Sequence, residues 1–167
     1  MIDIEKLKEE EKKKPIIEKD WISHGFRCIV LFWGGHRNGY IAIPKDTFVV
    51  RMKIHHDDLP IYVHGGITYE GDELGEGVKQ IVKNDGKVHW FGFDCAHAGD
   101  ALTWEKLSPS DHFWTAEEVA KECEDMAEQF SKLTLRKVIE FKLQNEPEWL
   151  RKYVRIKKTM ESIVDAI

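Results

Sequence analysis

The chain has 167 residues, of which 42% are hydrophobic and 33% are charged. That length predicts one domain with a hydrophobic core, because a folded chain of this size buries about two thirds of the surface it would expose unfolded. The formal net charge of -5, with histidines neutral, argues against a protein that binds specific DNA or RNA sequences, since such proteins usually carry a basic surplus. A small anionic ligand stays compatible, because a pocket can be locally positive on an acidic protein.

The cysteines and the apolar runs indicate a cytoplasmic protein. Cys28, Cys95 and Cys123 are an odd number of thiols in a chain that can fold without disulfides, which predicts that they are reduced. No apolar run approaches the roughly 20 residues of a membrane span, and the first residues lack the apolar stretch of a signal peptide. We therefore expect a cytoplasmic location and no membrane partner.

The beginning of the chain predicts a charged arm followed by a hairpin. Residues 1–20 form the arm, in which residues 3–14 make a short solvated helix or a frayed end. Residues 28–33 are β-branched and aromatic and predict a buried strand. The Gly-rich segment 34–39 predicts a loop, and residues 40–43 predict the strand that returns from it.

The middle of the chain predicts further short strands. Residues 47–54 place apolar side chains at every second position, which is typical of a strand with one buried face. Strands are also expected at residues 61–63, 67–69 and 88–93, with a Gly- and Glu-rich loop over residues 70–77.

Helices are expected last in the chain. Thr115 and Glu118 form a capping-box pattern, and apolar residues then recur on one helical face. A second helix is expected from Asn145, whereas residues 133–143 are compatible with either a helix or a strand.

This order of elements predicts an α+β fold, in which two or three helices pack on one face of an antiparallel sheet. The expected core domain covers residues 21–132, and residues 133–167 form a C-terminal helical extension.

The end of the strand at 88–93 carries an unusual group of reactive side chains. Asp94, Cys95, His97 and Asp100 fall within seven residues, and the residues between them are small. Polar groups at the end of a buried strand are costly unless they are paired or used. Each of these residues alone has an ordinary structural interpretation, but together they indicate a functional site.

A second candidate segment is His64-Gly65-Gly66, where a histidine ends a strand and two glycines follow. Two glycines offer exposed backbone N–H groups that suit phosphate or carboxylate oxygens, although a β-bulge with a surface histidine is equally compatible. Thr68 and Tyr69 come next and are candidate ligand-binding residues, since the tyrosine ring can stack on a base.

His36 and Arg37, in the Gly-rich segment, are a third candidate, because a guanidinium can bind a phosphate through two parallel hydrogen bonds.

A metal site is an alternative interpretation of the same residues. His64, Cys95 and His97 are donors that suit zinc, and Asp94 and Asp100 add carboxylates. The sequence contains no Cys-x-x-Cys or His-x-x-x-His pair, no nucleophile elbow, no P-loop and no Gly-x-Gly-x-x-Gly. We therefore expect no metal and no cofactor, with His64 and His97 as the acid and base and with Asp94 and Asp100 beside them.

Three segments carry a resemblance to a known family: residues 39–44 (GYIAIP), residues 63–69 (VHGGITY) and residues 90–100 (WFGFDCAHAGD). In these motifs the chain resembles an uncharacterised family of small proteins found in bacteriophages and prophages. The resemblance covers residues 21–130 and carries no catalytic assignment. It implies an accessory protein made inside an infected or lysogenic bacterium, where such proteins often counter host defences that signal through cyclic or ADP-ribose nucleotides.

Three functions follow as hypotheses. The first is a small hydrolase or phosphodiesterase that acts on a nucleotide through metal-free histidine chemistry. The second is a protein that sequesters an intact nucleotide. The third is a protein–protein inhibitor that uses the aromatic residues Trp104, Phe113 and Trp114 as anchors. Assembly into an oligomer is compatible with each of them.

Overall fold

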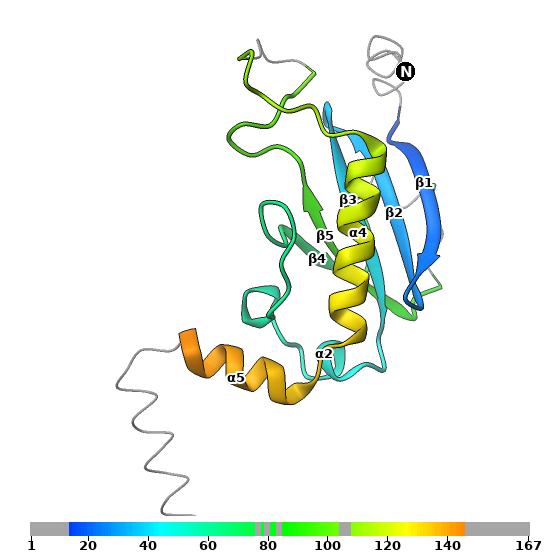
Figure 1. Cartoon of the computed structure of the whole chain (residues 1–167). Coiled ribbons are helices and arrows are strands. Elements are labelled where there is room, and N and C mark those ends of the chain that lie inside the picture. The colour runs from blue at the N-terminus through cyan, green and yellow to red at the C-terminus, as the bar shows by residue number, and fades with distance from the viewer. Residues whose placement is uncertain (1–13, 76–77, 79–80, 83–84, 104–107, 146–167) are drawn as a thin grey trace, which may run out of the picture.

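The computed structural model describes residues 14–75, 78, 81–82, 85–103 and 108–145. Five strands form one antiparallel sheet in the order β1-β2-β3-β5-β4, and a long helix, α4, lies across one face of it (Figure 1). The expected α+β fold is therefore confirmed. No helix among the described residues is long and apolar enough to cross a membrane.

The central hairpin joins β2 (Phe26–Trp33) to β3 (His36–Pro44). Trp33 pairs with His36, so the connection consists of Gly34 and Gly35 alone, with φ values of 71° and 75°. Two successive positive φ angles make a turn whose twist matches that of the strands, which is why two glycines suffice. The expected loop over residues 34–39 is therefore too long, because His36 and Arg37 already belong to β3.

The edge strand β1 (Ile16–Ser23) pairs with β2 and includes residues that the sequence assigned to the charged arm. Its acidic residues have partners on neighbouring strands. Glu18 pairs with Arg37 of β3, and Asp20 pairs with Arg27 of β2. These long-range partners make a charged segment compatible with a strand.

Two predicted strands are wrong. Residues 48–51 form a short helix, α2 (Phe48–Arg51), within the segment expected to be extended over residues 47–54. Residues 61–63 are not in a strand either, because the backbone groups of Tyr62 bond to helix α4 and those of its neighbours bond to Leu59 and Gly66 instead of to a strand. The Gln129 side chain both accepts from the Tyr62 N–H and donates to the Tyr62 carbonyl, each at 2.8 Å.

The remaining strands form the other edge of the sheet. β5 (Val88–Asp94) matches the predicted strand and pairs with β3 along its length. β4 (Tyr69–Gly71) is a short edge strand that pairs with β5; it shares only Tyr69 with the strand expected at 67–69 and extends into the segment expected to be a loop. A single 3-10 turn, η1 (His56–Asp58), precedes it.

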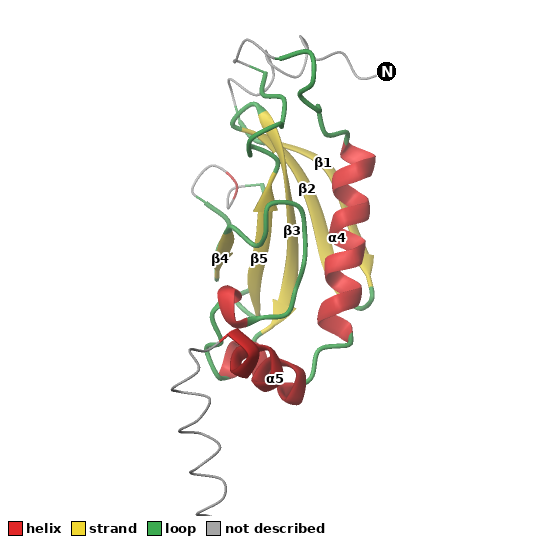
Figure 2. Ribbon diagram, turned by 60° about the vertical axis from the view of Figure 1, so that its left-hand side comes forward, coloured by secondary structure: helices red, strands yellow, loops and turns green. Residues whose placement is uncertain are grey.

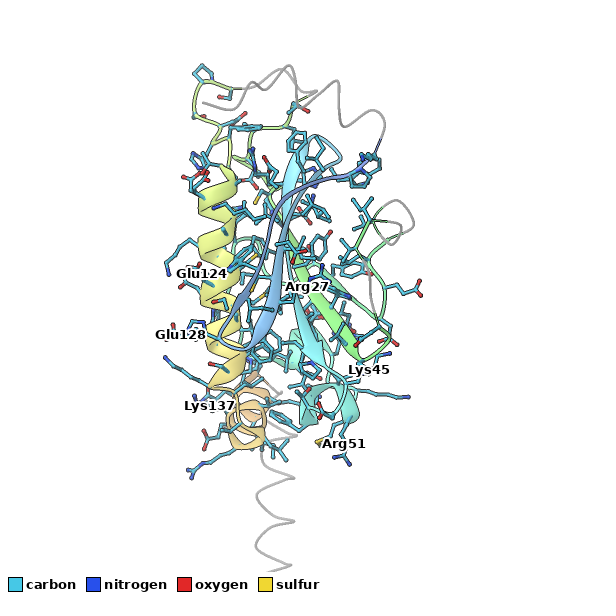
Figure 3. The ribbon with its side chains drawn as sticks, turned by 90° about the vertical axis from the view of Figure 1, so that its right-hand side faces the viewer. Arg27, Lys45, Arg51, Glu124, Glu128 and Lys137 are labelled. Atoms are coloured by element: carbon cyan, nitrogen blue, oxygen red, sulfur yellow. The ribbon has the colours of Figure 1, made fainter. Side chains whose placement is uncertain are left out.

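Helix α4 (Ala116–Ser131) begins with the predicted capping box, in which Thr115 accepts from the Glu118 N–H while the Glu118 side chain accepts from the Thr115 N–H. The predicted apolar face is buried against β1, β2 and β3, whereas Glu124 and Glu128 lie on successive turns at partly exposed positions (Figure 3). A helix also covers residues that were ambiguous: α5 (Leu135–Asn145) lies near η1 below the sheet (Figure 2). The helices expected at 3–14 and from Asn145 onward fall almost wholly outside the described residues.

The core has two layers. Between the sheet and α4 lies a cluster that includes Cys28, Ile41, Phe93, Cys123 and Met126. On the opposite face of the sheet, side chains of the segment after β4 pack against residues of the central strands. This second cluster consists of Ile29, Leu31, Ala42, Leu74, Val78, Val82 and Trp90. Both faces of the central strands are therefore buried, and the polar residues that end β5 stand where this burial stops.

Candidate functional site

His64, His97 and Asp100 meet at the end of β5, and we call these three residues the His–Asp cluster. His64 lies in a turn between η1 and β4, and the other two lie in the loop that follows β5. The backbone holds the two segments together, since the Thr68 N–H donates to the Gly92 carbonyl at 2.9 Å. The two segments that the sequence singled out thus come together in the fold.

Asp100 is the centre of the cluster and its side chain is only 4% exposed. Its carboxylate accepts three hydrogen bonds of 2.8 Å, from His64 Nε2, from the His97 backbone N–H and from Trp114 Nε1. Burial acts to raise the pKa of Asp100, but these hydrogen bonds outweigh it and leave the pKa below its usual value. Asp100 is therefore ionised at neutral pH, and His64 is the donor in their shared bond.

His97 lies on the other side of Asp100, with its ring at a steep angle to that of His64 and a centroid separation of 5.3 Å. The ring rests directly on Gly65, where a Cβ atom would come within 2.0 Å of His97 Cε1. Gly65 also has a φ of 65°, so a side chain there would be disfavoured twice. The two predicted segments therefore meet in close contact, and this contact requires a glycine.

The Nδ1 atom of His97 has an unusual environment. It lies 3.7 Å from Asp94 Oδ1 and 3.6 Å from Asp100 Oδ2, which is too far for a good hydrogen bond. This buried nitrogen has no hydrogen-bond partner in the structure. A buried polar atom without a partner is costly and needs an explanation.

Asp94 forms the edge of the site next to His97. Its carboxylate accepts from Thr68 Oγ1 at 2.8 Å and from the Ala96 N–H at 3.1 Å. Its side chain is 30% exposed, so solvent reaches it more readily than it reaches Asp100. Thr68, a candidate from the sequence, therefore acts on the site by holding Asp94 in place.

His64 is fixed from two further directions. Its backbone N–H donates to Glu122 Oε2 of α4 at 2.9 Å, and its ring lies 4.3 Å from the Trp114 ring. Glu122 and Gln129 are two turns apart on α4, and they bind the backbone at positions 64 and 62. The helix therefore sets the path of the chain that delivers His64 to the cluster.

Trp114 and Glu122 had no place in the site expected from the sequence. Trp114 was considered only as a candidate interface anchor, and Glu122 was not singled out. No local signal marks them, because their partners, Asp100 and His64, lie 14 and 58 residues away in the chain.

Other predicted residues lie away from the cluster. Arg37 is 3% exposed and binds Glu18 through two hydrogen bonds, and its Nη1 donates to the Trp114 carbonyl at 2.6 Å. His36 Nδ1 donates to the Gly34 carbonyl, and Tyr69 donates to the Glu73 carbonyl while its ring packs edge-on against Tyr40. These contacts give all three side chains structural roles.

Cys95 points into the core instead of into the site. It is 2% exposed, and burial together with the negative charges of Asp100 and Asp94 raises the pKa of its thiol well above the usual range. A buried thiol in that state is not a nucleophile at neutral pH. We therefore leave Cys95 and Arg37 out of the candidate site.

Gly66 has a φ of 85° and donates its backbone N–H to the Val63 carbonyl at 3.0 Å, which closes the turn at His64. A Cβ at this position would meet no atom within 4 Å. The two glycines thus differ, since Gly65 makes room for His97 and Gly66 only shapes the turn.

Two surface pockets among the described residues lie elsewhere. One of about 370 Å³ is lined by residues that include Lys45, Val49 and His89, and another of about 350 Å³ lies between Pro60 and α5. The His–Asp cluster lines neither of them, and its two rings are 24% and 33% exposed. We give the cluster priority because it has the reactive groups, whereas the pockets have mainly apolar walls and paired charges.

Comparison of the chain with protein-family models, with curated proteins and with solved structures found no match.

Proposed function

We propose that the protein hydrolyses a phosphoester bond of a small nucleotide at the His–Asp cluster. The observation that carries this proposal is the convergence of two imidazoles and two carboxylates from two segments about 30 residues apart in the chain, with the imidazoles accessible to solvent. Groups of this kind move protons at neutral pH, which is what the attack of water and the departure of an alcohol require.

The contacts of Asp100 support a role for His64 in proton transfer. An ionised carboxylate that accepts from one imidazole nitrogen fixes the tautomer of the ring and stabilises its protonated form. Asp100 meets this requirement because it is buried, ionised and held by Trp114 and by the His97 backbone. A His64 ring held in this way is suited to accept a proton from water.

Two features support a nucleotide as the substrate. The Trp114 ring is partly exposed and lies beside His64, where a base can stack on it. The motifs at 63–69 and 90–100 resemble those of the phage family, and this resemblance implies contact with nucleotide signals of host defence. The fold alone carries no information about the substrate.

Sequestration of an intact nucleotide is the second candidate. The same Trp114 ring supports it, and so does the shallow position of the cluster. Binding alone does not require a group that is placed for proton transfer. The third hypothesis, a protein–protein inhibitor, has less support. Trp104 lies outside the described residues, the Phe113 ring contacts the Arg37 guanidinium at 5.2 Å, and Trp114 bonds to Asp100.

The test is to incubate the purified chain with cyclic dinucleotides, cyclic mononucleotides and ADP-ribose derivatives, with and without added divalent ions. Free and protein-released small molecules are then analysed by mass spectrometry. Hydrolysis predicts a product heavier than a cyclic substrate by one water, and its loss in His97→Ala. A nucleotide that leaves solution and returns intact after denaturation indicates sequestration, and nucleotides that all stay free and unchanged contradict both functions.

His24→Asn is a matched control for this assay. His24 is exposed, is remote in sequence from the cluster and has a φ of 50°, a conformation that asparagine also adopts readily. Its variant should keep the rate of the unmodified chain.

A further inference from the structure

The His–Asp cluster has the composition and the spacing of a metal-ligand set. One donor atom from each of His64, His97 and Asp100 lies within 4.8 Å of the others. Two imidazoles and one carboxylate, with a further position open to water or substrate, are a common ligand set in catalytic metal centres. The sequence offered these residues among its candidate metal donors but favoured a metal-free site, because the donors come from two distant segments instead of one spaced motif.

The distances around His97 agree with ligand spacing better than with hydrogen bonding. An ion that binds four ligands at 2.0–2.2 Å holds neighbouring ligand atoms roughly 3.4 Å apart. His97 Nδ1 lies 3.6 Å from Oδ2 of Asp100, the carboxylate of the same set. The same nitrogen is buried and lacks a hydrogen-bond partner, so it is available as a metal ligand.

The charge of the site also favours a cation. Asp94, Asp100 and Glu122 lie in or beside the cluster, and none of the contacts that the described residues make with His64, His97, Asp94 or Asp100 comes from a lysine or an arginine. Arg37, which lies behind Trp114, is already neutralised by Glu18. An anionic phosphate would meet only negative charge here, whereas a bound cation would reverse it.

We propose that His64, His97 and Asp100 bind one divalent transition-metal ion of the zinc class, with release of the proton that His64 donates to Asp100 in the metal-free chain. Two imidazole nitrogens select zinc, cobalt or nickel over magnesium and calcium, which prefer oxygen ligands throughout. This proposal replaces the metal-free site that the sequence led us to expect. Trp114 Nε1 and the His97 backbone N–H orient the Asp100 ligand, and Glu122 holds the backbone of His64, so two of the three ligands are supported by neighbouring groups.

A catalytic role for the ion rests on the proposed hydrolysis. Such a role would also change the parts that the individual residues play. The ion would lower the pKa of a bound water and counter the charge of the phosphate. His64 and His97 would then act as ligands, and the proton acceptor would be Asp94, which is 30% exposed and lies 3.7 Å from His97 Nδ1. Metal binding itself does not depend on the identity of the substrate.

The test uses the full chain, stripped of metal with a chelator and titrated with Zn²⁺ against a competing indicator dye. A parallel titration with Co²⁺ is followed by visible absorption, which reports nitrogen and oxygen ligation directly. We expect one tightly bound equivalent. In His64→Ala and in His97→Ala the affinity should fall by at least about 100-fold, because each variant removes a ligand. His97→Gln serves as a second variant if His97→Ala unfolds, and circular dichroism shows whether each variant is folded.

The control is the double variant His55→Ala/His56→Ala, because those two residues and Asp57 also place donor atoms within 4.8 Å of one another. That group is more exposed, with His55 at 53% and Asp57 at 79%. Loss of the tight equivalent in this control, its retention in both cluster variants, or its absence from the unmodified chain would each overturn the proposal. A tight site without nucleotide turnover refutes the proposed function alone, and turnover by the chelated chain refutes only the catalytic role of the ion.

Discussion

His64 Nε2 donates to Asp100 Oδ2 at 2.8 Å, although 36 residues separate them in the chain. This bond joins the turn before β4 to the loop after β5, and the Gly65–His97 contact lies next to it. The geometry of the whole cluster depends on these two contacts. Variants that perturb one of them while leaving the fold intact are therefore the most informative.

Gly65→Ala and Gly66→Ala form a matched pair. Both glycines have positive φ angles, so each alanine should lower the free energy of unfolding by about 1 kcal/mol or somewhat more. Only at Gly65 would the new Cβ meet the His97 ring. We expect Gly65→Ala to displace His97 and to reduce turnover by at least about 100-fold, which is the effect of losing a catalytic proton carrier. Gly66→Ala should have little effect on turnover. Thermal unfolding and nucleotide turnover measured side by side would check this, and equal effects on turnover would contradict it.

Asp100→Asn tests the buried carboxylate. The amide keeps the volume of the side chain but loses the charge that three donors share, so we expect a loss of about 2 kcal/mol in the free energy of unfolding at neutral pH. The measurement is urea denaturation of both chains. An unchanged stability would mean that the three hydrogen bonds do not stabilise the fold.

The same variant gives a pH dependence with a defined sign. Because the pKa of Asp100 is lowered by folding, its stabilising effect is complete above the unfolded value near 3.8 and is lost as the pH falls through the folded value. The stability difference between the unmodified chain and Asp100→Asn should therefore be constant above about pH 5 and should shrink in more acidic solution. A difference that grows as the pH falls would contradict the assignment.

Arg37 provides a test of a structural role. Its pairing with Glu18 is buried, so Arg37→Met should cost about 3–5 kcal/mol by leaving a carboxylate without its partner. The double variant Arg37→Met/Glu18→Met should recover much of that loss, since no unpaired charge remains. If Arg37 instead binds a ligand phosphate, the double variant would be stable but would fail to bind nucleotide. Denaturation and nucleotide retention together separate the two roles.

Local signals in the sequence predicted much of the fold. The capping box at Thr115, the apolar face of α4 and the β-branched segment of β2 each depend on residues close in the chain, and each is confirmed. Two of the failures occurred where partners outside the segment decide the conformation. The segment at 61–63 has the residues of a strand, but Gln129 of α4 takes its hydrogen bonds, and the charged strand β1 needs Arg27 and Arg37 to pair its carboxylates.

The candidate site was predictable in its residue types but not in its contacts. The heptapeptide from Asp94 to Asp100 and the segment His64-Gly65-Gly66 are unusual in composition, and that marked them as candidates. The sequence could not indicate that Cys95 faces the core, that Arg37 is used by Glu18, or that Trp114 supports Asp100. These facts depend on which face of a strand or loop each side chain occupies and on partners far away in the chain.

The most direct test of the account is turnover of a nucleotide in water labelled with oxygen-18, with product mass as the measurement. Hydrolysis at the His–Asp cluster predicts that one labelled oxygen enters the product formed by the unmodified chain, that His97→Ala forms no product, and that His24→Asn behaves like the unmodified chain. Product without labelled oxygen would exclude hydrolysis. Labelled product formed equally well by folded His97→Ala would show that the reaction takes place somewhere other than the cluster.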